Sequence, residues 1–559
     1  MMKSSIRSIL TLIIISCNLA AFAQVKSPTY TLADTLRGSL NAERIWWDVQ
    51  RYELAFKPDY TNKTISGSNE ILYKVVKTND GKTKMQIDLQ EPLVIDSIWY
   101  NEKLKLTFEH VGSVWYAHVP AQKNTEVNRV KIFYHGAVHQ AKRAPWDGGF
   151  IFTTDSLSRP WMTVACQGLG ASVWYPNKDH QSDEPDLGAS LTMTIPDTLV
   201  GVGNGRLVFK KNNNDGTITY KYNVQSAISN YCIIPYIGKY VNFKEEYPGE
   251  KGKLDVNYWV LDYNYNKAKT YMPDQVHKML KSFEHWFGPY PFYEDGYQLI
   301  DASHTGMEHQ SAVSYGNKYK FGYLGRDMSG NGWGIKWDFI IIHESGHEWF
   351  GNNITTKDLA DMWVHEGFTN YSETLFVDYI FGKQAGNEYN YGIRKGIRND
   401  SPIIPAYGVN AQGSGDMYPK GGNMLHAIRH SMDNDELFRS ILRGLNKTFY
   451  HQTVTTAQIE NYFSKQAGYP YAKVFDQYLR TTQIPVFEYY IKNGEVFYRY
   501  TNCVSGFNLP LVLRKEGVKA LKIIPSGKWN HLKLSTGQES LVEKSSIESM
   551  YYLNVKNKV

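Results

Sequence analysis

The sequence predicts a multidomain α+β protein with a β domain first, a largely helical domain next and a small β module last. Three observations predict this order. Apolar and polar residues alternate through the first part of the chain, the period lengthens to that of helices from about residue 240, and alternation returns after Pro485. The 559 residues, 42% of them hydrophobic, are enough to form several cores.

Residues 24–239 are expected to form the β domain. The segments 52–56, 130–134 and 202–209 alternate apolar and polar side chains, which is the pattern of strands with one face buried. Asn213-Asn214-Asp215-Gly216 separates two such segments. It predicts a hairpin, because Asn, Asp and Gly accept the positive φ angles that tight turns need.

Residues 240–484 carry helical periodicity. Apolar side chains recur there every three to four positions, as in helices that pack one face against a core. The segments concerned are 274–287, 337–350, 361–381, 423–430 and 455–465. We therefore expect a helical domain in the middle of the chain.

Residues 485–559 are expected to form the small β module. We expect the helical part to end at Pro485, because proline has no backbone N–H and its ring clashes with the preceding turn of a helix. The segments 486–491 and 495–500 then flank Asn493-Gly494, a second clear hairpin signal. Since no repeat or low-complexity linker separates the three parts, we expect them to pack into one body.

The first 23 residues are predicted to be a signal peptide. Basic side chains precede an apolar run at 9–15, and Ala21-Phe22-Ala23 offers a small-x-small cleavage site. That run is far shorter than the ~20 residues needed to span a bilayer, and no other segment looks transmembrane. Residues 14–17 also resemble a bacterial lipobox, which would lipidate Cys17. We expect an exported protein, periplasmic or secreted, with a membrane-tethered lipoprotein as the alternative.

The charge and cysteine content exclude two classes of protein. The net charge is +6, from 61 Lys and Arg against 55 Asp and Glu, and no basic run concentrates it. We therefore expect no nucleic-acid partner. Four cysteines in this length exclude a disulfide scaffold. Cys166, Cys232 and Cys503 are expected to be buried thiols.

A metal-binding pattern lies inside the predicted helix 337–350. His343-Glu344-Ser345-Gly346-His347 places two histidines four residues apart. Residues with this spacing share one helical face, so both imidazoles can reach one zinc ion, with Glu344 beside the open position.

A catalytic zinc ion needs a third protein ligand, and Glu366 is the candidate. It follows His347 by 19 residues, inside the predicted helix 361–381. Its carboxylate interrupts an apolar, aromatic stretch, where a free charge would be costly unless it is paired or metal-bound. His365 points about 100° away from it and is expected to be structural.

These two segments belong to a longer pattern. The run 343–352 (HESGHEWFGN) followed by 363–368 (WVHEGF) resembles the zinc signature of the M1 family of gluzincin aminopeptidases. Gly306-Met307-Glu308-His309 resembles the exopeptidase motif of that family, and Tyr418-Pro419-Lys420-Gly421 resembles its Y-x-K-G segment. Cys166-Gln167, with Trp174-Tyr175-Pro176 after it, resembles a segment of the family's N-terminal domain.

The resemblance covers roughly residues 45–480 and implies a fold and a cofactor. The implied fold is a saddle-like β-sheet domain, a thermolysin-like catalytic domain and the small C-terminal β module. The chain stops about 75 residues past the catalytic domain. The large helical C-terminal domain of many members is therefore expected to be absent. The implied cofactor is one zinc ion (Zn²⁺) per chain, held by His343, His347 and Glu366.

The resemblance also implies a mechanism on peptides with a free N-terminus. Glu344 is expected to act as general base on a water molecule. Tyr418 is expected to donate a hydrogen bond to the oxyanion, and Glu308 and Gln167 to bind the substrate's ammonium group. Gly306 and Met307 are expected to be further substrate-binding residues, with the Gly306 backbone along the extended substrate. Glu373 is expected to orient a ligand histidine. Binding of the ammonium group close to the zinc ion would make the enzyme an exopeptidase, because only the N-terminus of a peptide can place a cation at that position.

One residue departs from the family pattern. His309 stands where the family usually has Asn. The amine-binding Glu308 is intact, but a charge on His309 could compete for the same carboxylate.

Three other functions are weighed against an aminopeptidase. A thermolysin-like endopeptidase shares the same three zinc ligands but needs an open cleft and no amine anchor. The site also resembles that of the leukotriene-hydrolase branch, which hydrolyses a small lipid epoxide. No residue of this sequence singles out that reaction. A catalytically silent, zinc-dependent surface binding protein would not explain why base, ligands and tyrosine are all present.

Overall fold

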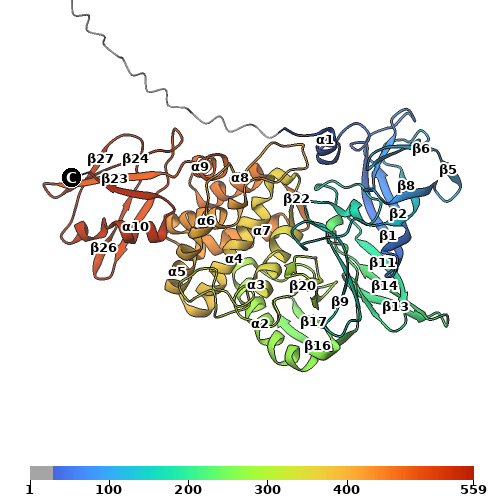
Figure 1. Ribbon diagram of the computed structural model, residues 1–559. Helices are drawn as coiled ribbons and strands as arrows, with labels where there is room; N and C mark the ends of the chain where they lie inside the picture. Colours follow the sequence, from blue (N-terminus) through green and yellow to red (C-terminus); the bar gives the residue numbers. More distant parts are fainter. Residues whose placement is uncertain (1–28, 559) are drawn as a thin grey trace, which may run out of the picture.

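The structure is a computed structural model that describes residues 29–558, and its three regions lie in a row (Figure 1). Sheets of the N-terminal part lie at one end, helices in the middle and the C-terminal sheets at the other end. The predicted signal peptide at residues 1–23 and the alternative lipidation site Cys17 lie outside the described residues. Within those residues, no helix has the length and apolar character needed to cross a membrane.

The N-terminal region is a set of β-sheets behind one short helix, α1 (Leu32–Gly38). Among the described residues its largest sheet has eight strands in the order β13-β14-β11-β1-β2-β8-β4-β5. These strands are β1 (Trp47–Asp59), β2 (Thr64–Val75), β4 (Val94–Tyr100), β5 (Leu104–Leu106), β8 (Val127–Ala137), β11 (Ala189–Pro196), β13 (Arg206–Asn212) and β14 (Thr217–Val224). Buried and partly exposed side chains alternate along β1 and β8, as the sequence predicts for a half-buried sheet.

Two smaller sheets complete this region. One joins β3 (Met85–Asp88), β7 (Val114–Ala117) and β6 (Phe108–Val111). The other joins β12 (Val200–Val202), β15 (Tyr236–Gly238), β10 (Pro160–Ala165) and β9 (Gly149–Thr154). The loop that follows β10 carries Gln167 toward the middle region, so this sheet contributes directly to the site described below.

The prediction of one strand over residues 202–209 is wrong. Strand β12 ends at Val202 and β13 begins at Arg206, and the two belong to different sheets. Gly205 has φ +72, and a Cβ atom there would lie 2.2 Å from the carbonyl oxygen of Asn223. The chain therefore turns at a position that only glycine fits. Beyond the break the side chains do not alternate, since β13 is exposed from Leu207 to Asn212. The hairpin predicted at residues 213–216 is confirmed between β13 and β14.

The middle region begins with a five-stranded mixed sheet, counted within the described residues, in the order β16-β17-β18-β20-β19. The strands are β16 (Tyr240–Gly249), β17 (Gly252–Leu261), β18 (Tyr297–Asp301), β19 (Gly306–Met307) and β20 (Val313–Tyr315). Strand β19 pairs with β20 on one side only and is an edge of the sheet. That edge lines the cavity described below.

Helices pack on this sheet and on one another to form the rest of the region. They are α2 (Tyr265–Phe287), α3 (Phe339–Gly346), α4 (Trp363–Phe381), α5 (Lys383–Ile393), α6 (Pro419–Met432), α7 (Asp435–Thr448), α8 (Thr456–Ala467) and α9 (Ala472–Arg480), with the short strands β21 (Ile354–Thr356) and β22 (Gln452–Val454) beside them. Four of the five segments predicted to be helical lie wholly or largely within α2, α4, α6 and α8, and α3 covers part of the fifth. Their apolar faces form a single core that extends into the C-terminal region.

Helix α3 is shorter than the predicted segment 337–350. It ends at Gly346, and His347 follows in right-handed helical backbone (φ −64, ψ −21). The next turn is wider, because the N–H of Asn352 bonds to the carbonyl of His347 at 2.9 Å, and Gly351 takes φ +135. The histidines of the motif still lie one turn apart, so this early end keeps the predicted shared face.

The C-terminal region combines two small sheets with helix α10 (Lys544–Met550). Their strands are β23 (Val486–Lys492), β24 (Glu495–Thr501), β27 (Asn530–Lys533) and β28 (Asn554–Asn557) in one sheet, and β25 (Leu511–Lys515) and β26 (Val518–Ile523) in the other. The hairpin predicted around Asn493-Gly494 is confirmed between β23 and β24. Its inward-facing side chains, such as Phe487 and Val496, join the core of the helical region.

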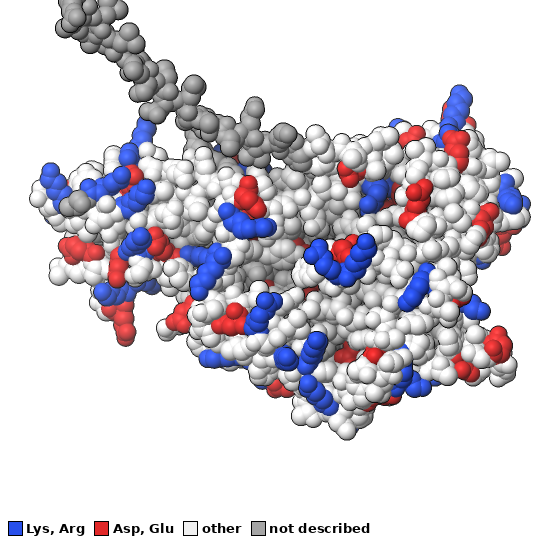
Figure 2. Space-filling view, viewed as in Figure 1, with Lys and Arg blue, Asp and Glu red and all other residues white. Residues whose placement is uncertain are grey.

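The surface charge and the thiols complete the description. Lys and Arg side chains are interspersed with Asp and Glu on the face shown in Figure 2, so the positive net charge is dispersed over it. Cys166 and Cys232 are free and buried, and Cys503 is free and half-buried. Burial raises the pKa of the Cys166 and Cys232 thiols well above the ordinary value, which keeps them protonated.

Candidate active site

Two histidines at the end of α3, His343 and His347, point their Nε2 atoms into one cavity. The Nδ1 atom of His343 donates to Oε1 of Glu373 at 2.7 Å, and the Nδ1 atom of His347 donates to the carbonyl of Phe350 at 3.0 Å. These bonds occupy one nitrogen of each ring, so the Nε2 atoms keep lone pairs for another partner. Both Nε2 atoms lie near Oε2 of Glu366, at 3.9 Å from His343 and 3.3 Å from His347.

Glu366 lies in the first turn of α4 and completes the group. Its side chain is 3% exposed, and its Oε2 atom has no hydrogen-bond partner among the described residues. Burial would raise the pKa of this carboxyl, but the facing His347 and His343 lower it to about 2. The site therefore holds a buried, ionised carboxylate with an unused oxygen beside two unused imidazole nitrogens.

This donor set fits a zinc ion. Two imidazole nitrogens and one carboxylate oxygen are the ligands of catalytic zinc sites that keep a fourth position open. Glu308, Glu344 and Glu366 all surround His347, and although burial lowers its pKa, these carboxylates raise the pKa to about 10. So strong a preference for positive charge in a buried place favours a bound cation.

Glu344 lies beside the same group. One carboxylate oxygen of Glu344 and one nitrogen each of His343 and His347 lie within 4.8 Å of one another. Burial raises the pKa of Glu344 to about 7, which suits a group that takes and returns a proton near neutral pH. Gly306 approaches it closely, since a Cβ atom there would lie 2.5 Å from Oε1 of Glu344.

The predicted amine-binding residues also meet at this cavity. Glu308 is 2% exposed and accepts a hydrogen bond from the hydroxyl of Tyr231 at 2.9 Å. Gln167 reaches across from the N-terminal region, and its Nε2 atom donates to Oε1 of Glu366 at 3.3 Å. Gly306 and Met307 form the edge strand β19 along the cavity wall.

Tyr418 lies against His343, just before helix α6. Its ring stacks on that imidazole with 6.1 Å between centroids and 23° between planes. Burial, followed by the charge of Glu366, raises the pKa of its hydroxyl well above the ordinary value. The hydroxyl therefore keeps its proton and can donate a hydrogen bond into the cavity.

The structure removes the predicted competition from His309. Its Nδ1 atom lies 2.6 Å from the hydroxyl of Tyr236 and 3.0 Å from that of Ser314. Burial, then the neighbouring His304, lowers the pKa of His309 well below the ordinary value. A neutral imidazole held by these hydroxyls brings no charge to Glu308.

Several supporting residues escape sequence reasoning. Tyr231 bonds to Glu308, and the Nδ2 atom of Asn352 donates to the backbone carbonyl of Glu308 at 2.8 Å. Tyr389 and Asn370 donate to the carboxylate of Glu373, the latter at 3.2 Å. Only Asn352 carries a signal in the sequence, since it is the last residue of the run 343–352 that resembles the zinc signature. The others come from distant segments that only the fold brings together.

The cavity has a volume of about 520 Å³, and side chains from two regions line it. Gln167, Pro145 and Trp146 come from the N-terminal region, and Trp146 is 73% exposed at the rim. The apolar part of the wall in the middle region is formed by Met307, Tyr323, Met328, Phe339, Ile340 and Ile393. A cavity of this size admits a few residues of a peptide chain and excludes a folded domain.

Comparison with known proteins agrees with this geometry. Residues 271–478 match the model of the peptidase family M1 domain. Endoplasmic reticulum aminopeptidase 1 of Mus musculus is 25% identical over 285 residues, which are 48% of this chain and 30% of that protein. A probable aminopeptidase 2 of Sulfurisphaera tokodaii is 21% identical over 512 residues, which are 86% of this chain and 60% of that protein.

A solved structure shows the same fold. The M1 zinc metallopeptidase from Deinococcus radiodurans superposes with a TM-score of 0.65 at 17% identity, over 78% of this chain and 94% of that one. The fold and the site thus define a zinc metallopeptidase domain. Residues 271–478 of the middle region match the peptidase family M1 domain, and the larger part of the chain shares its fold with the solved metallopeptidase. The matched part spans less than a third of the mouse relative.

Proposed function

We propose that the protein is a zinc-dependent aminopeptidase that removes single residues from the N-termini of peptides. The observation that carries the proposal is the placement of Glu308 and Gln167. Both line the cavity that holds the zinc-binding group, and Gln167 contacts the ligand Glu366 itself. A substrate's ammonium group would be held within about one residue of the zinc ligands, so cleavage is limited to the first peptide bond.

The residues of the site support a stepwise account of the reaction. His343, His347 and Glu366 would hold a zinc ion, which would supply Lewis-acid polarisation of the scissile carbonyl and of a water molecule. Glu344 takes the proton of that water and delivers it to the leaving amine. Tyr418 donates a hydrogen bond to the developing oxyanion, a contribution of about 3 kcal/mol in comparable sites.

The substrate's backbone has a natural partner in strand β19. This strand pairs with β20 on one side, and the cavity lies on its other side. An extended peptide could add to this edge, as in other complexes formed by strand addition. The absence of a side chain at Gly306 lets the substrate approach the backbone there.

A panel of amino-acid reporter amides, free and N-acetylated, tests the proposal when assayed with and without a zinc chelator. We expect rapid cleavage of the free-amine reporters, poor cleavage of the acetylated ones and loss of both with chelator. Glu308→Ala should depress cleavage of free-amine reporters ten- to a hundredfold, because it removes a charge-assisted contact of ~1.5–3 kcal/mol.

Each alternative predicts a different result in that panel. A thermolysin-like endopeptidase would cleave N-blocked peptides internally as fast as it trims free ones. A zinc-dependent binding protein would cleave nothing while retaining the metal. Either result would replace the aminopeptidase proposal.

We also propose that the chain is exported, to the periplasm or out of the cell. The support is the basic start, the apolar run at residues 9–15 and the small residues at Ala21-Phe22-Ala23. The alternative is a membrane-tethered lipoprotein acylated at Cys17. Mass measurement of the mature N-terminus separates the two, since cleavage after Ala23 leaves Gln24 first and lipidation leaves an acylated Cys17.

A further inference from the structure

The loop that carries Gln167 is tight, and it contacts the zinc-binding group through the Gln167 side chain. It follows β10, and within it the N–H of Gly170 bonds to the carbonyl of Cys166 at 2.7 Å. Gly168 and Gly170 have φ values of +73 and +95, a conformation that costs glycine little and other residues much. Two glycines beside Gln167 leave the loop free to bend unless something behind it fixes the backbone.

Arg37 of α1 lies behind this loop. Its guanidinium donates to the carbonyl of Leu169, which also accepts from Nε2 of Gln90 at 2.7 Å. The same guanidinium lies 3.8 Å from the carboxylate of Asp179, and the Arg37 side chain is 16% exposed. A charged donor on a carbonyl in a largely buried place forms one of the stronger hydrogen bonds in proteins.

Asp179 fixes the other end of the loop. Its Oδ2 atom accepts from the backbone N–H of Ser172 at 3.2 Å and also from the hydroxyl of Ser172. A Cβ atom on Gly170 would lie 2.1 Å from this oxygen and 2.5 Å from Nη2 of Arg37. The loop is therefore pressed directly against the Arg37–Asp179 pair, with no room between them.

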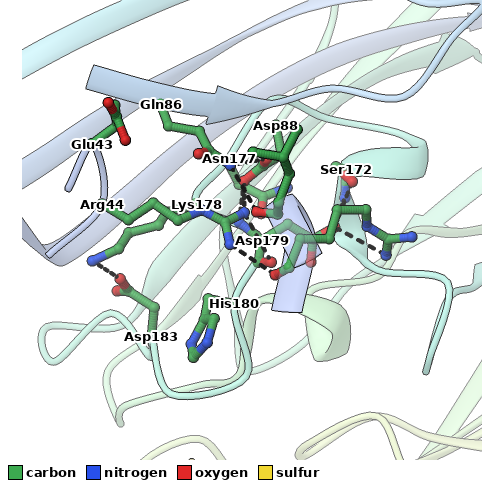
Figure 3. A network of polar contacts seen from close by, with 12 residues as sticks. Glu43, Arg44, Gln86, Asp88, Ser172, Asn177, Lys178, Asp179, His180 and Asp183 are labelled. Carbon is green, nitrogen blue, oxygen red and sulfur yellow. Dashed lines mark hydrogen bonds and ion pairs between the residues drawn. The ribbon is translucent and has the colours of Figure 1, made fainter. Parts of the chain in front are cut away.

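The pair is part of a larger buried network (Figure 3). Arg44 forms an ion pair with Asp88 and donates to the carbonyl of Asp179 at 3.3 Å. It also holds the end of α1, since its Nη1 atom donates to the carbonyl of Arg37 at 2.7 Å. In Figure 3, dashed lines join Arg44, Asp88, Asp179 and Ser172 into one set of polar contacts.

Helix α1 is also clamped from the middle region. The N–H of Asn410 bonds to the carbonyl of Asp34 in α1 at 3.0 Å, and its Nδ2 atom donates to the carbonyl of Gly168 at 3.3 Å. One residue of the middle region thus contacts both α1 and the Gln167 loop. The short helix at the start of the described chain therefore connects the two regions behind the loop that carries Gln167.

We propose that Arg37 is a positioning residue for the amine-binding site and acts through Gln167. The proposal rests on the proposed aminopeptidase function. With Arg37 in place, the loop presents the Gln167 amide to the cavity before substrate arrives, so binding does not have to order it. Without Arg37, the loop retains its glycines and loses a charged support, and the Gln167 amide spreads over several positions.

A double-mutant cycle tests the proposal on the full-length, zinc-loaded protein. Leucine 4-nitroanilide is assayed with the parent, Arg37→Ala, Gln167→Ala and the double variant. We expect Arg37→Ala to raise KM about tenfold with kcat nearly unchanged, because ground-state holding of the amine is what weakens. In the Gln167→Ala background, Arg37→Ala should have no further effect on KM.

The controls separate positioning from general stability. Arg129→Ala removes another ion-paired but 54% exposed arginine of the N-terminal region and should leave KM unchanged. Arg37→Lys keeps the charge with fewer donors and should give a KM between those of the parent and Arg37→Ala. Added methylguanidinium should lower the KM of Arg37→Ala and leave that of the double variant unchanged.

Three results would overturn the proposal. They are an unchanged KM in Arg37→Ala, an equal rise in KM with and without Gln167, and a loss of kcat that follows the melting temperature. The proposed function fails separately, through a parent enzyme that does not distinguish leucine 4-nitroanilide from its N-acetylated form. An active, amine-selective parent with an unaffected Arg37→Ala variant refutes only the role of Arg37.

Discussion

The carboxylate of Glu373 lies 2.7 Å from Nδ1 of His343, although 30 residues separate the two in the chain. Glu373 is held in turn by the hydroxyl of Tyr389 and the side-chain amide of Asn370. This chain of contacts fixes both the ring orientation and the tautomer of His343, so that Nε2 faces Glu366. Such outer contacts commonly decide how tightly a site holds its metal.

Glu373→Ala should weaken zinc binding about 10- to 100-fold without abolishing it. The physical reason is that the His343 ring gains freedom to rotate and loses the acceptor that fixes its tautomer. Competition with a chromophoric chelator measures the affinity. Glu388→Ala, which removes an exposed carboxylate from the same part of the chain, is the matched control. Equal zinc affinity in Glu373→Ala and the parent would show that the contact is incidental.

Glu344→Gln should keep its zinc and lose turnover by about two to four orders of magnitude. The amide is similar in shape but cannot take a proton from water. Elemental analysis of the purified variant and its kcat on leucine 4-nitroanilide provide the two measurements. A variant with full zinc and near-parent turnover would remove Glu344 from the mechanism.

The parent should hold one zinc ion per chain, and His347→Ala and Glu366→Ala should each lose it. Both substitutions remove one of three protein ligands from a site whose fourth position is open. Glu308→Ala is the control, because it removes a nearby carboxylate that is not a ligand in this account. Elemental analysis after dialysis decides the matter, and zinc retained in either ligand variant would contradict the assignment.

Glu184 gives a prediction about pH and stability. It is buried, and its Oε1 atom has no hydrogen-bond partner among the described residues. Burial raises the pKa of this carboxyl from 4.5 to about 8. Between these pH values the folded form is protonated and the unfolded form ionised, so stability falls as pH rises, by up to about 1.4 kcal/mol per unit.

Glu184→Gln should therefore raise the melting temperature relative to the parent at pH 8, and this gain should shrink toward pH 5. The amide removes the cost of burying an ionisable group and changes the shape little. Glu126→Gln, at an exposed position, should show no such pH-dependent difference. A gain that is the same at pH 5 and pH 8 would mean that Glu184 is not the group responsible.

The parts of the site that could be predicted from sequence are those set by local geometry or by a contiguous motif. His343 and His347 share a face because four residues make about one helical turn, and this holds although α3 ends earlier than predicted. The hairpins at residues 213–216 and at Asn493-Gly494 were predictable for the same reason, since turn chemistry is a property of two to four neighbouring residues.

The parts that could not be predicted depend on packing between distant segments. Tyr231 reaches Glu308 from 77 residues away, and Arg37 reaches Leu169 from 132 residues away. The break at Gly205 was missed for a related reason. Alternation reports which faces are buried, but it does not report that the carbonyl of Asn223 occupies the space a side chain would need.

The glycine at position 306 has a consequence for how this sequence can vary. A methyl group there would displace either the carboxylate of Glu344 or the side chain of Ile340, whose Cγ2 atom would lie 2.8 Å away. The neighbour with more freedom is the carboxylate at the open cavity. Variants at this position are expected to fold and to lose turnover, so the need for glycine here comes from the reaction and not from the stability of the chain.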